Sequence, residues 1–101
     1  MMRLHDGKYI LEGHTPVRCE DIMTWGRFME LQNRVVEKTK VGDVEVSTVF
    51  IGLDHGWGEG PPILFETMIF GGKHDQFQER YPTWDEAVAG HEAAVRMVKE
   101  G

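Results

Sequence analysis

The chain has 101 residues, of which 41% are hydrophobic and 28% charged, values typical of one folded globular domain. Its net charge of −6 disfavours nucleic acid as a partner, because phosphates are also negative and the 11 Lys and Arg residues are dispersed. The single cysteine, Cys19, excludes an internal disulfide, and no apolar run approaches the roughly 20 residues that cross a bilayer. We therefore expect a single cytoplasmic domain over residues 1–101, without a secretory leader or membrane anchor.

The first third of the chain predicts a small hairpin followed by a helix. Residues 8–12 are rich in β-forming side chains, and residues 13–16 form a turn sequence before a second short extended segment. Asp21 then precedes apolar residues at helical spacing, which are Ile22, Trp25, Phe28 and Met29. The pattern predicts a helix over residues 22–32 with Asp21 as its N-cap.

The middle of the chain predicts a longer hairpin. Two β-branched runs, residues 34–41 and 44–53, are separated by Gly42 and Asp43, a pair suited to a two-residue turn that places Val41 opposite Val44. The expected core face then carries alternate residues, which are Val35, Glu37, Thr39, Val41, Val44, Val46, Thr48 and Phe50. The other face is apolar at its far end through Val36, Val49 and Ile51. We expect another element or another subunit to pack against this apolar end.

The last third predicts a strand, a loop and a helix. Residues 63–70 are apolar on both faces, which is typical of a central strand or one under a subunit interface, and residues 73–80 read as a polar loop. Thr83 and Glu86 form a capping box for a helix over residues 84–99. The buried stripe of that helix is expected to contain Trp84, Val88, His91, Val95 and Val98. His91 is interpreted as a core histidine with hydrogen-bond partners.

These elements predict an α+β fold, an antiparallel sheet of three to five strands with two amphipathic helices packed on one face. Two helices cannot fully cover the apolar end of the long hairpin and one face of residues 63–70. We therefore expect a homodimer or a larger homo-oligomer.

The best candidate for a functional segment is the loop over residues 54–62, where three glycines and two prolines exclude regular structure. It combines Asp54, His55 and Trp57 on adaptable backbone. Two interpretations stay open. In one, Trp57 stacks on a ring of a bound ligand; in the other, the loop only connects two strands and Trp57 packs on the core.

A second set of polar residues could supply metal ligands or an acid–base pair, namely Asp54, His55, Glu66, His74 and Asp75, although their spacing selects neither. Glu66 lies within an apolar strand, where a carboxylate needs a partner or water. It either faces a pocket or pairs with an arginine such as Arg34, and we favour the pair. Cys19 lacks a recognisable histidine partner or a basic setting that would activate its thiol, so a catalytic cysteine is not expected.

We place the candidate ligand site at the sheet end that carries residues 54–60, with Glu66, His74 and Tyr81 as neighbours. The hairpin register puts Asp54 at the end away from Gly42. His74 and Tyr81 follow Gly71, which lies at the opposite end of its strand, so they reach the site only if the later loop folds back or comes from a second subunit.

Residues 46–55 read VSTVFIGLDH and residues 60–72 read GPPILFETMIFGG. With the helix around Trp25 and residues 80–91, these stretches resemble a family of short hypothetical proteins found mostly in phages, prophages and some bacterial genomes. The family loop reads Asp-His-Asn-Phe before its glycines, whereas this chain has Gly56 and Trp57 in the third and fourth positions. The aromatic ring is kept and the side-chain amide is absent.

This resemblance implies a phage accessory protein that acts in the cytoplasm of the bacterial host against its immune defences. The first hypothesis is a homo-oligomeric sponge that binds a small nucleotide-like signalling molecule without cofactor and without cleaving it. The first alternative is an inhibitor that docks its acidic surface on a host effector. The second is a small phosphodiesterase that uses Asp54, His55 and Glu66. Recovery of intact ligand, of product, or of neither would separate these hypotheses.

Overall fold

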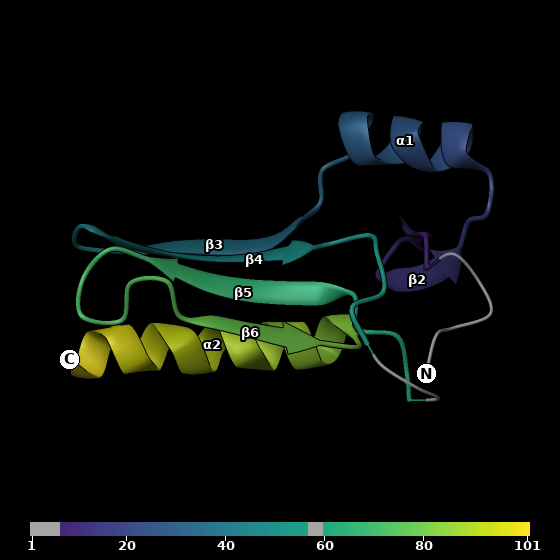
Figure 1. Cartoon of the computed structure of the whole chain (residues 1–101). Coiled ribbons are helices and arrows are strands. Elements are labelled where there is room, and N and C mark those ends of the chain that lie inside the picture. The colour runs from purple at the N-terminus through teal and green to yellow at the C-terminus, as the bar shows by residue number, and fades with distance from the viewer. Residues whose placement is uncertain (1–6, 57–59) are drawn as a thin grey trace.

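A computed structural model of the chain describes residues 7–56 and 60–101. In chain order the elements are β1 (Tyr9–Glu12), β2 (Thr15–Arg18), α1 (Ile22–Leu31), β3 (Val35–Val41), β4 (Val44–Phe50), β5 (Phe65–Phe70), β6 (Gln78–Tyr81) and α2 (Trp84–Glu100). β1 and β2 form a separate hairpin, and the other strands form an antiparallel sheet in the order β3-β4-β5-β6 (Figure 1). The predicted α+β class and antiparallel sheet are confirmed.

Local sequence signals set the boundaries of these elements as predicted. The Asp21 side chain accepts a hydrogen bond from Met23 N and begins α1. The Thr83 hydroxyl accepts one from Glu86 N at 3.1 Å and begins α2. Gly42 has a φ of 60°, which allows the tight turn that pairs Val41 with Val44. The hairpin register is therefore confirmed at its turn.

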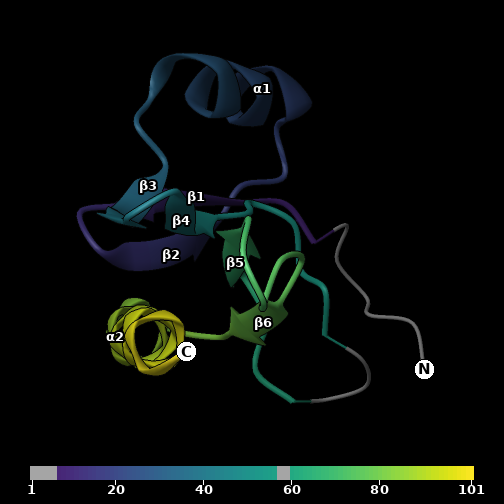
Figure 2. The same cartoon turned by 90° about the vertical axis from the view of Figure 1, so that its left-hand side faces the viewer.

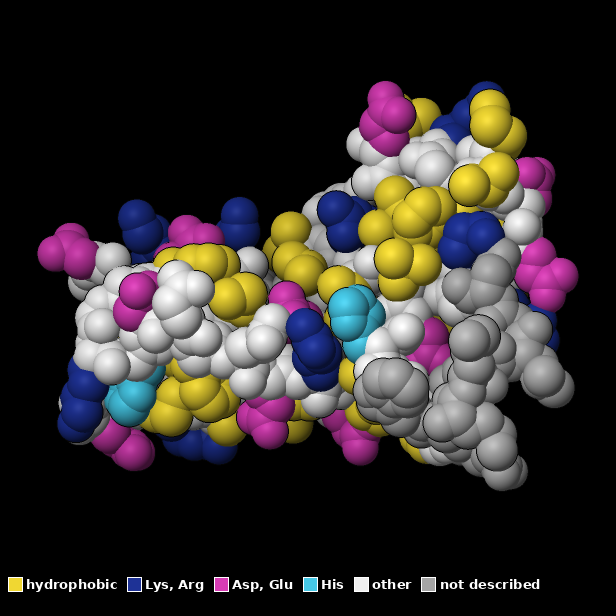
Figure 3. All heavy atoms as spheres, in the orientation of Figure 1, with side chains coloured by type: hydrophobic (Ala, Val, Ile, Leu, Met, Phe, Trp, Pro, Cys, Tyr) yellow, Lys and Arg dark blue, Asp and Glu magenta, His cyan; other side chains and the backbone are white. Residues whose placement is uncertain are grey.

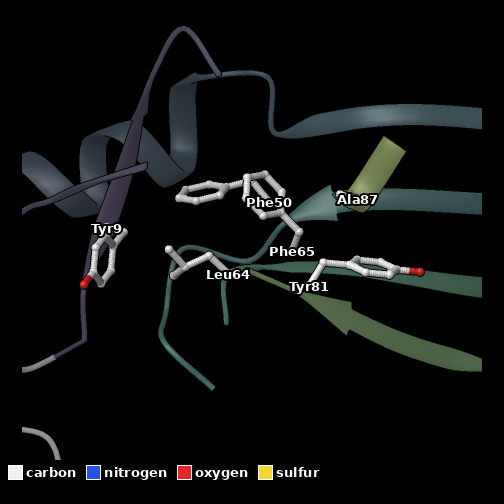
Figure 4. Close-up of a cluster of buried hydrophobic side chains, with 6 residues drawn as sticks. All are labelled: Tyr9, Phe50, Leu64, Phe65, Tyr81 and Ala87. Atoms are coloured by element: carbon white, nitrogen blue, oxygen red, sulfur yellow. The ribbon is translucent and has the colours of Figure 1, made fainter. Parts of the chain in front are cut away.

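The hydrophobic core lies between the sheet and α2, which runs along one face and contacts all four strands (Figures 1 and 2). Alternate residues of the central strands point toward α2 and are fully buried, as expected from the strand period. One core cluster, drawn in Figure 4, contains Tyr9, Phe50, Leu64, Phe65, Tyr81 and Ala87. The other contains Val46, Ile69 and Ala94.

The prediction that both helices share one face is wrong for α1. This helix contacts β1 and the segment after β4, on the side away from α2 (Figure 2). Trp25 Nε1 donates to the Gly52 carbonyl at 3.1 Å, and the Phe28 ring meets the Phe50 ring edge-on at 6.0 Å. Because α2 already covers the inner face of all four strands, α1 packs at the end of the sheet, and no residue of α1 is buried.

A β-bulge reverses the predicted sides of two valines. Val35 pairs with Val49 and Glu37 pairs with Thr48, so Val36 is an extra residue in β3. Val36 therefore packs against the first core cluster, and Val35 shares the outer face with Val49. The expected core face is otherwise confirmed, since Val46, Thr48 and Phe50 are all 0% exposed.

The segment predicted as a polar loop over residues 73–80 ends in a strand, β6. Its register pairs Phe65 with Tyr81, and only Tyr81 of its residues is buried. An edge strand with solvated side chains lacks the alternation of apolar residues that reveals a strand in sequence. The strand predicted over residues 63–70 begins at Phe65 in the structure, and because β6 pairs with β5 its predicted central position is confirmed.

The β1–β2 hairpin is joined to the start of α2 by an aromatic contact. The His14 and Trp84 rings are stacked, with centroids 3.7 Å apart and planes at 4°. His14 lies at the tip of the hairpin and Trp84 is the first residue of α2. The contact holds the hairpin against the start of α2.

Candidate functional site

The base of the candidate loop is closed by Asp54. Its Oδ1 accepts hydrogen bonds from Gly56 N at 2.8 Å and from Ile63 N at 2.9 Å. His55 N also donates to the Ile63 carbonyl at 3.0 Å, so both arms of the loop are held together. Asp54 thus has a structural role, and the exposed His55 is fixed beside it. Trp57 lies outside the described residues, and its role stays a prediction.

The start of the same segment is held by α1. Gly52 is buried and has a φ of 79°, a conformation that favours glycine. A Cβ at this position would lie 2.5 Å from Met29 Sδ, so glycine also allows the close approach of α1. Together with the Trp25 bond to the Gly52 carbonyl, this contact couples α1 to the loop end of the sheet.

Glu66 forms the structural pair that we favoured, with a different arginine. It lies opposite Arg80 in the β5–β6 register, and Arg80 Nε donates to Glu66 Oε2 at 2.9 Å. Gln78 donates to the same oxygen. Arg34, the partner suggested by the sequence, instead donates to the Phe50 carbonyl at 3.1 Å. The Glu66 side chain is 14% exposed, so it is largely shielded as well as paired.

The structure places His74 away from the loop end and brings Tyr81 there with its side chain buried. His74 lines a small hollow at the opposite end of the sheet, beside Val44 and the end of α2. Tyr81 returns to the loop end on β6, but its ring is buried under α2. Burial raises the pKa of the Tyr81 phenol, an effect that Thr67 partly opposes. The site at the loop end therefore contains Asp54 and His55, with the Glu66–Arg80 pair at the start of β5.

A buried polar network under α2 was only partly predicted. His91 is 1% exposed, with Nδ1 2.7 Å from Thr48 Oγ1 and Nε2 2.9 Å from Thr39 Oγ1. Thr48 Oγ1 in turn lies 2.5 Å from Thr67 Oγ1. The prediction of a satisfied core histidine is confirmed. The threonines were missed as a group, although Thr39 and Thr48 already shared the predicted inner face.

This network predicts a pH-dependent stability. Burial lowers the pKa of His91, and Glu37 and Glu92 partly oppose that shift. The unfolded chain therefore binds the proton more readily, so the stabilisation is complete above about pH 6.5 and is lost as pH falls through the lower folded-state pKa. We expect the Tm to fall between about pH 7.5 and about pH 5.

The variant His91→Gln has no titratable group at this buried position and should show a lower Tm with a shallower pH dependence. His55→Gln removes an exposed histidine and should keep the wild-type slope. Thermal unfolding followed by circular dichroism across this pH range measures both. Equal slopes for His91→Gln and the wild type would show that another group is responsible.

Comparisons with known proteins add no family to this geometry: no family model, no curated protein and no solved structure matches the chain. Among residues 7–56 and 60–101, no three His, Cys, Asp or Glu side chains gather as a metal ion would require. Neither of the described helices has the length and apolar character of a membrane span. The functional argument therefore depends on the arrangement of this chain's own residues.

Proposed function

We propose that the protein binds its target without chemical conversion, and that the loop end of the sheet at residues 54–56 is a ligand site. The observation that carries this proposal is that the candidate acid–base groups are already engaged in contacts that hold the fold together. Asp54 Oδ1 closes the loop, Glu66 is paired with Arg80, and Tyr81 is buried. General acid–base catalysis needs such groups within reach of the substrate and ready to exchange a proton.

The proposed ligand is a small nucleotide-like molecule, as the resemblance to phage proteins implies. His55 is exposed at the loop base, and the Arg80 side chain is 39% exposed at the same end of the sheet. The net charge of −6 disfavours a highly anionic ligand, so stacking on a base is expected to supply most of the affinity. A stacked base typically contributes about 1–3 kcal/mol.

The test uses the whole chain and a panel of cyclic nucleotides and ADP-ribose derivatives. Bound ligand is released by heat and identified by mass spectrometry. Intact ligand supports the proposal, whereas a hydrolysed product would show an enzyme. The absence of binding to the whole panel would contradict a nucleotide-like ligand.

Substitution of Asp54 separates a structural from a catalytic carboxylate. Asp54→Asn keeps an oxygen that accepts from Gly56 N and Ile63 N, so we expect nearly wild-type stability and binding. Asp54→Ala leaves these two donors without that acceptor and should lower the free energy of unfolding by about 1–3 kcal/mol. Urea unfolding and calorimetric titration measure both effects. If Asp54→Asn abolished turnover of a panel member, Asp54 would be catalytic.

A protein target is the second candidate, because α1 exposes large apolar side chains. Ile22, Met23 and Leu31 are 64%, 73% and 67% exposed and line one hollow along this helix. Exposed apolar side chains that lie close together often mark protein interaction sites. An inhibitor of a host effector would bind no member of the nucleotide panel, so the same assay separates the two candidates.

A further inference from the structure

The face of the sheet opposite α2, here called the outer face, carries all the basic residues of strands β3 to β6. Residues paired across an antiparallel sheet lie on the same face, so the register defines this face. Its basic residues are Lys38, Lys40 and Arg80, and its acidic residues are Glu45 and Glu66. The whole chain has a net charge of −6, whereas three basic against two acidic residues give this face +1. The outer face is therefore the side of the sheet better suited to an anionic group.

The outer face is open along its strands. Figure 2 shows α2 on one side of the sheet, and α1 packs only at the loop end. Figure 3 shows apolar side chains exposed over the strands, with Lys and Arg side chains beside them. The apolar residues of this face are Val35, Val49, Met68 and Phe70. The Arg80 side chain is 39% exposed, so a ligand can reach it without displacing either helix.

Two neighbouring residues hold the Arg80 guanidinium in place. Arg80 Nε donates to Glu66 Oε2 at 2.9 Å, and Gln78 Nε2 donates to the same oxygen. Glu66 lies opposite Arg80 in the β5–β6 register, and its side chain is only 14% exposed. Because the guanidinium is planar and rigid, the bond at Nε limits the directions in which its terminal nitrogens can point.

The terminal nitrogens of Arg80 are the donors of this cluster that remain available. Among the residues that the structure describes, none accepts a hydrogen bond from Nη1 or Nη2 of Arg80. By contrast, Arg18 and Arg34 each use a terminal nitrogen for their contact with the protein. The two terminal nitrogens of an arginine match two oxygens of one phosphate, and such charge-assisted pairs are among the strongest hydrogen bonds in proteins. Arg80 thus combines a restrained guanidinium with free donors.

We propose that Arg80 binds a phosphate group of the nucleotide-like ligand, with Glu66 and Gln78 as positioning residues. This inference rests on the proposed function and adds the place of the phosphate. The carbonyl of Tyr81, the next residue, accepts from Leu64 N, so Arg80 adjoins the loop end where the base is expected to stack. Restraint of the side chain before binding reduces the entropy that it loses on binding. Because Glu66 offsets one positive charge, the site suits one phosphate better than a polyphosphate.

Titration with inorganic phosphate tests the site independently of the nucleotide panel. In NMR spectra of the arginine side-chain N–H groups of the whole chain, the Arg80 Nε signal should shift and approach saturation at millimolar phosphate. Sodium chloride at the same ionic strength should cause little shift. Arg96, an exposed arginine on α2, is the internal control and should not respond. An Arg80 signal that moves no more than that of Arg96 up to about 50 mM phosphate would overturn the proposal.

Substitutions separate a phosphate site from a purely structural ion pair. Arg80→Lys keeps the positive charge and removes the paired terminal nitrogens, so binding of a phosphate-containing panel member should weaken at least about tenfold. Arg96→Lys is the matched control and should leave the affinity unchanged. Glu66→Gln keeps an oxygen that accepts from Arg80 Nε and removes the opposing charge, so the affinity should stay equal or increase. Circular dichroism confirms that each variant is folded.

The phosphate site and the ligand proposal can fail separately. Equal affinity of Arg80→Lys and the wild type for a panel member that binds would overturn the phosphate site and leave the ligand proposal standing. A saturable shift of Arg80 with phosphate, when no panel member binds, would support the phosphate site and contradict a nucleotide-like ligand. If Glu66→Gln lost as much affinity as Arg80→Lys, the carboxylate charge itself would be required, and the positioning role of Glu66 would be overturned.

Discussion

Replacing Phe50 with alanine is expected to lower the free energy of unfolding by about 3–5 kcal/mol, the usual cost of deleting a fully buried aromatic ring. Phe50 is 0% exposed. The centroid of its ring lies 5.4 Å from that of Phe65 and 6.0 Å from that of Phe28. Phe50 therefore contacts both α1, through Phe28, and the core beneath α2, through Phe65. Loss of the ring should loosen α1 together with the sheet end, which hydrogen exchange of the α1 amides would report.

Phe70→Ala is the control for this prediction. It removes the same side chain from the same sheet, but Phe70 is 42% exposed at the end of β5. Its cost should stay below about 1 kcal/mol, as is common for exposed positions away from special contacts. Urea unfolding of both variants gives the comparison. Similar losses for the two variants would mean that Phe50 is not the centre of the core.

Gly90→Ala is expected to destabilise the protein, although alanine favours a helix over glycine by about 1 kcal/mol. A Cβ at position 90 would lie 2.1 Å from Tyr81 Oη and 2.2 Å from Tyr81 Cζ. Tyr81 is buried between the sheet and α2, so its ring cannot move away freely. Overpacking of this kind typically costs about 1–3 kcal/mol.

Gly26→Ala is the matched variant in the other helix. A Cβ there meets no atom within 4 Å, so the helix preference alone should raise the stability of the monomer by up to about 1 kcal/mol. Thermal unfolding at low micromolar concentration compares the two changes, which should have opposite signs. Stabilisation by Gly90→Ala would mean that Tyr81 does not occupy the space beside α2.

Much of the fold could be predicted from the sequence because its signals are local. The Gly42 turn needs only its own backbone conformation, and the N-caps Asp21 and Thr83 bond within their own first turns. These features fixed the long hairpin and the start of each helix. The strand predicted over residues 63–70, observed over residues 65–70, was recognisable from its apolar composition.

The remaining features depend on contacts between distant segments. The bulge in β3 turns Val36 toward the first core cluster, a contact with distant residues that the local sequence does not record. β6 has too few apolar residues to be recognised as a strand. Missing β6 also concealed Arg80, so the partner of Glu66 could not be identified from sequence. The placement of α1 depended on α2 occupying the inner face, which no pattern within residues 22–32 records.

The order β3-β4-β5-β6 has a consequence for how the chain folds. Each strand pairs with the strand next to it along the chain, so most sheet contacts close short loops. The hairpin at Gly42 has the shortest loop and is expected to form first, with β5, β6 and α2 adding in turn. The stack of His14 on Trp84 joins the first hairpin to the start of α2, segments far apart in the sequence, and should form late. His14→Ala weakens this stack and should therefore accelerate unfolding while leaving the refolding rate nearly unchanged. Stopped-flow measurements of unfolding and refolding give both rates.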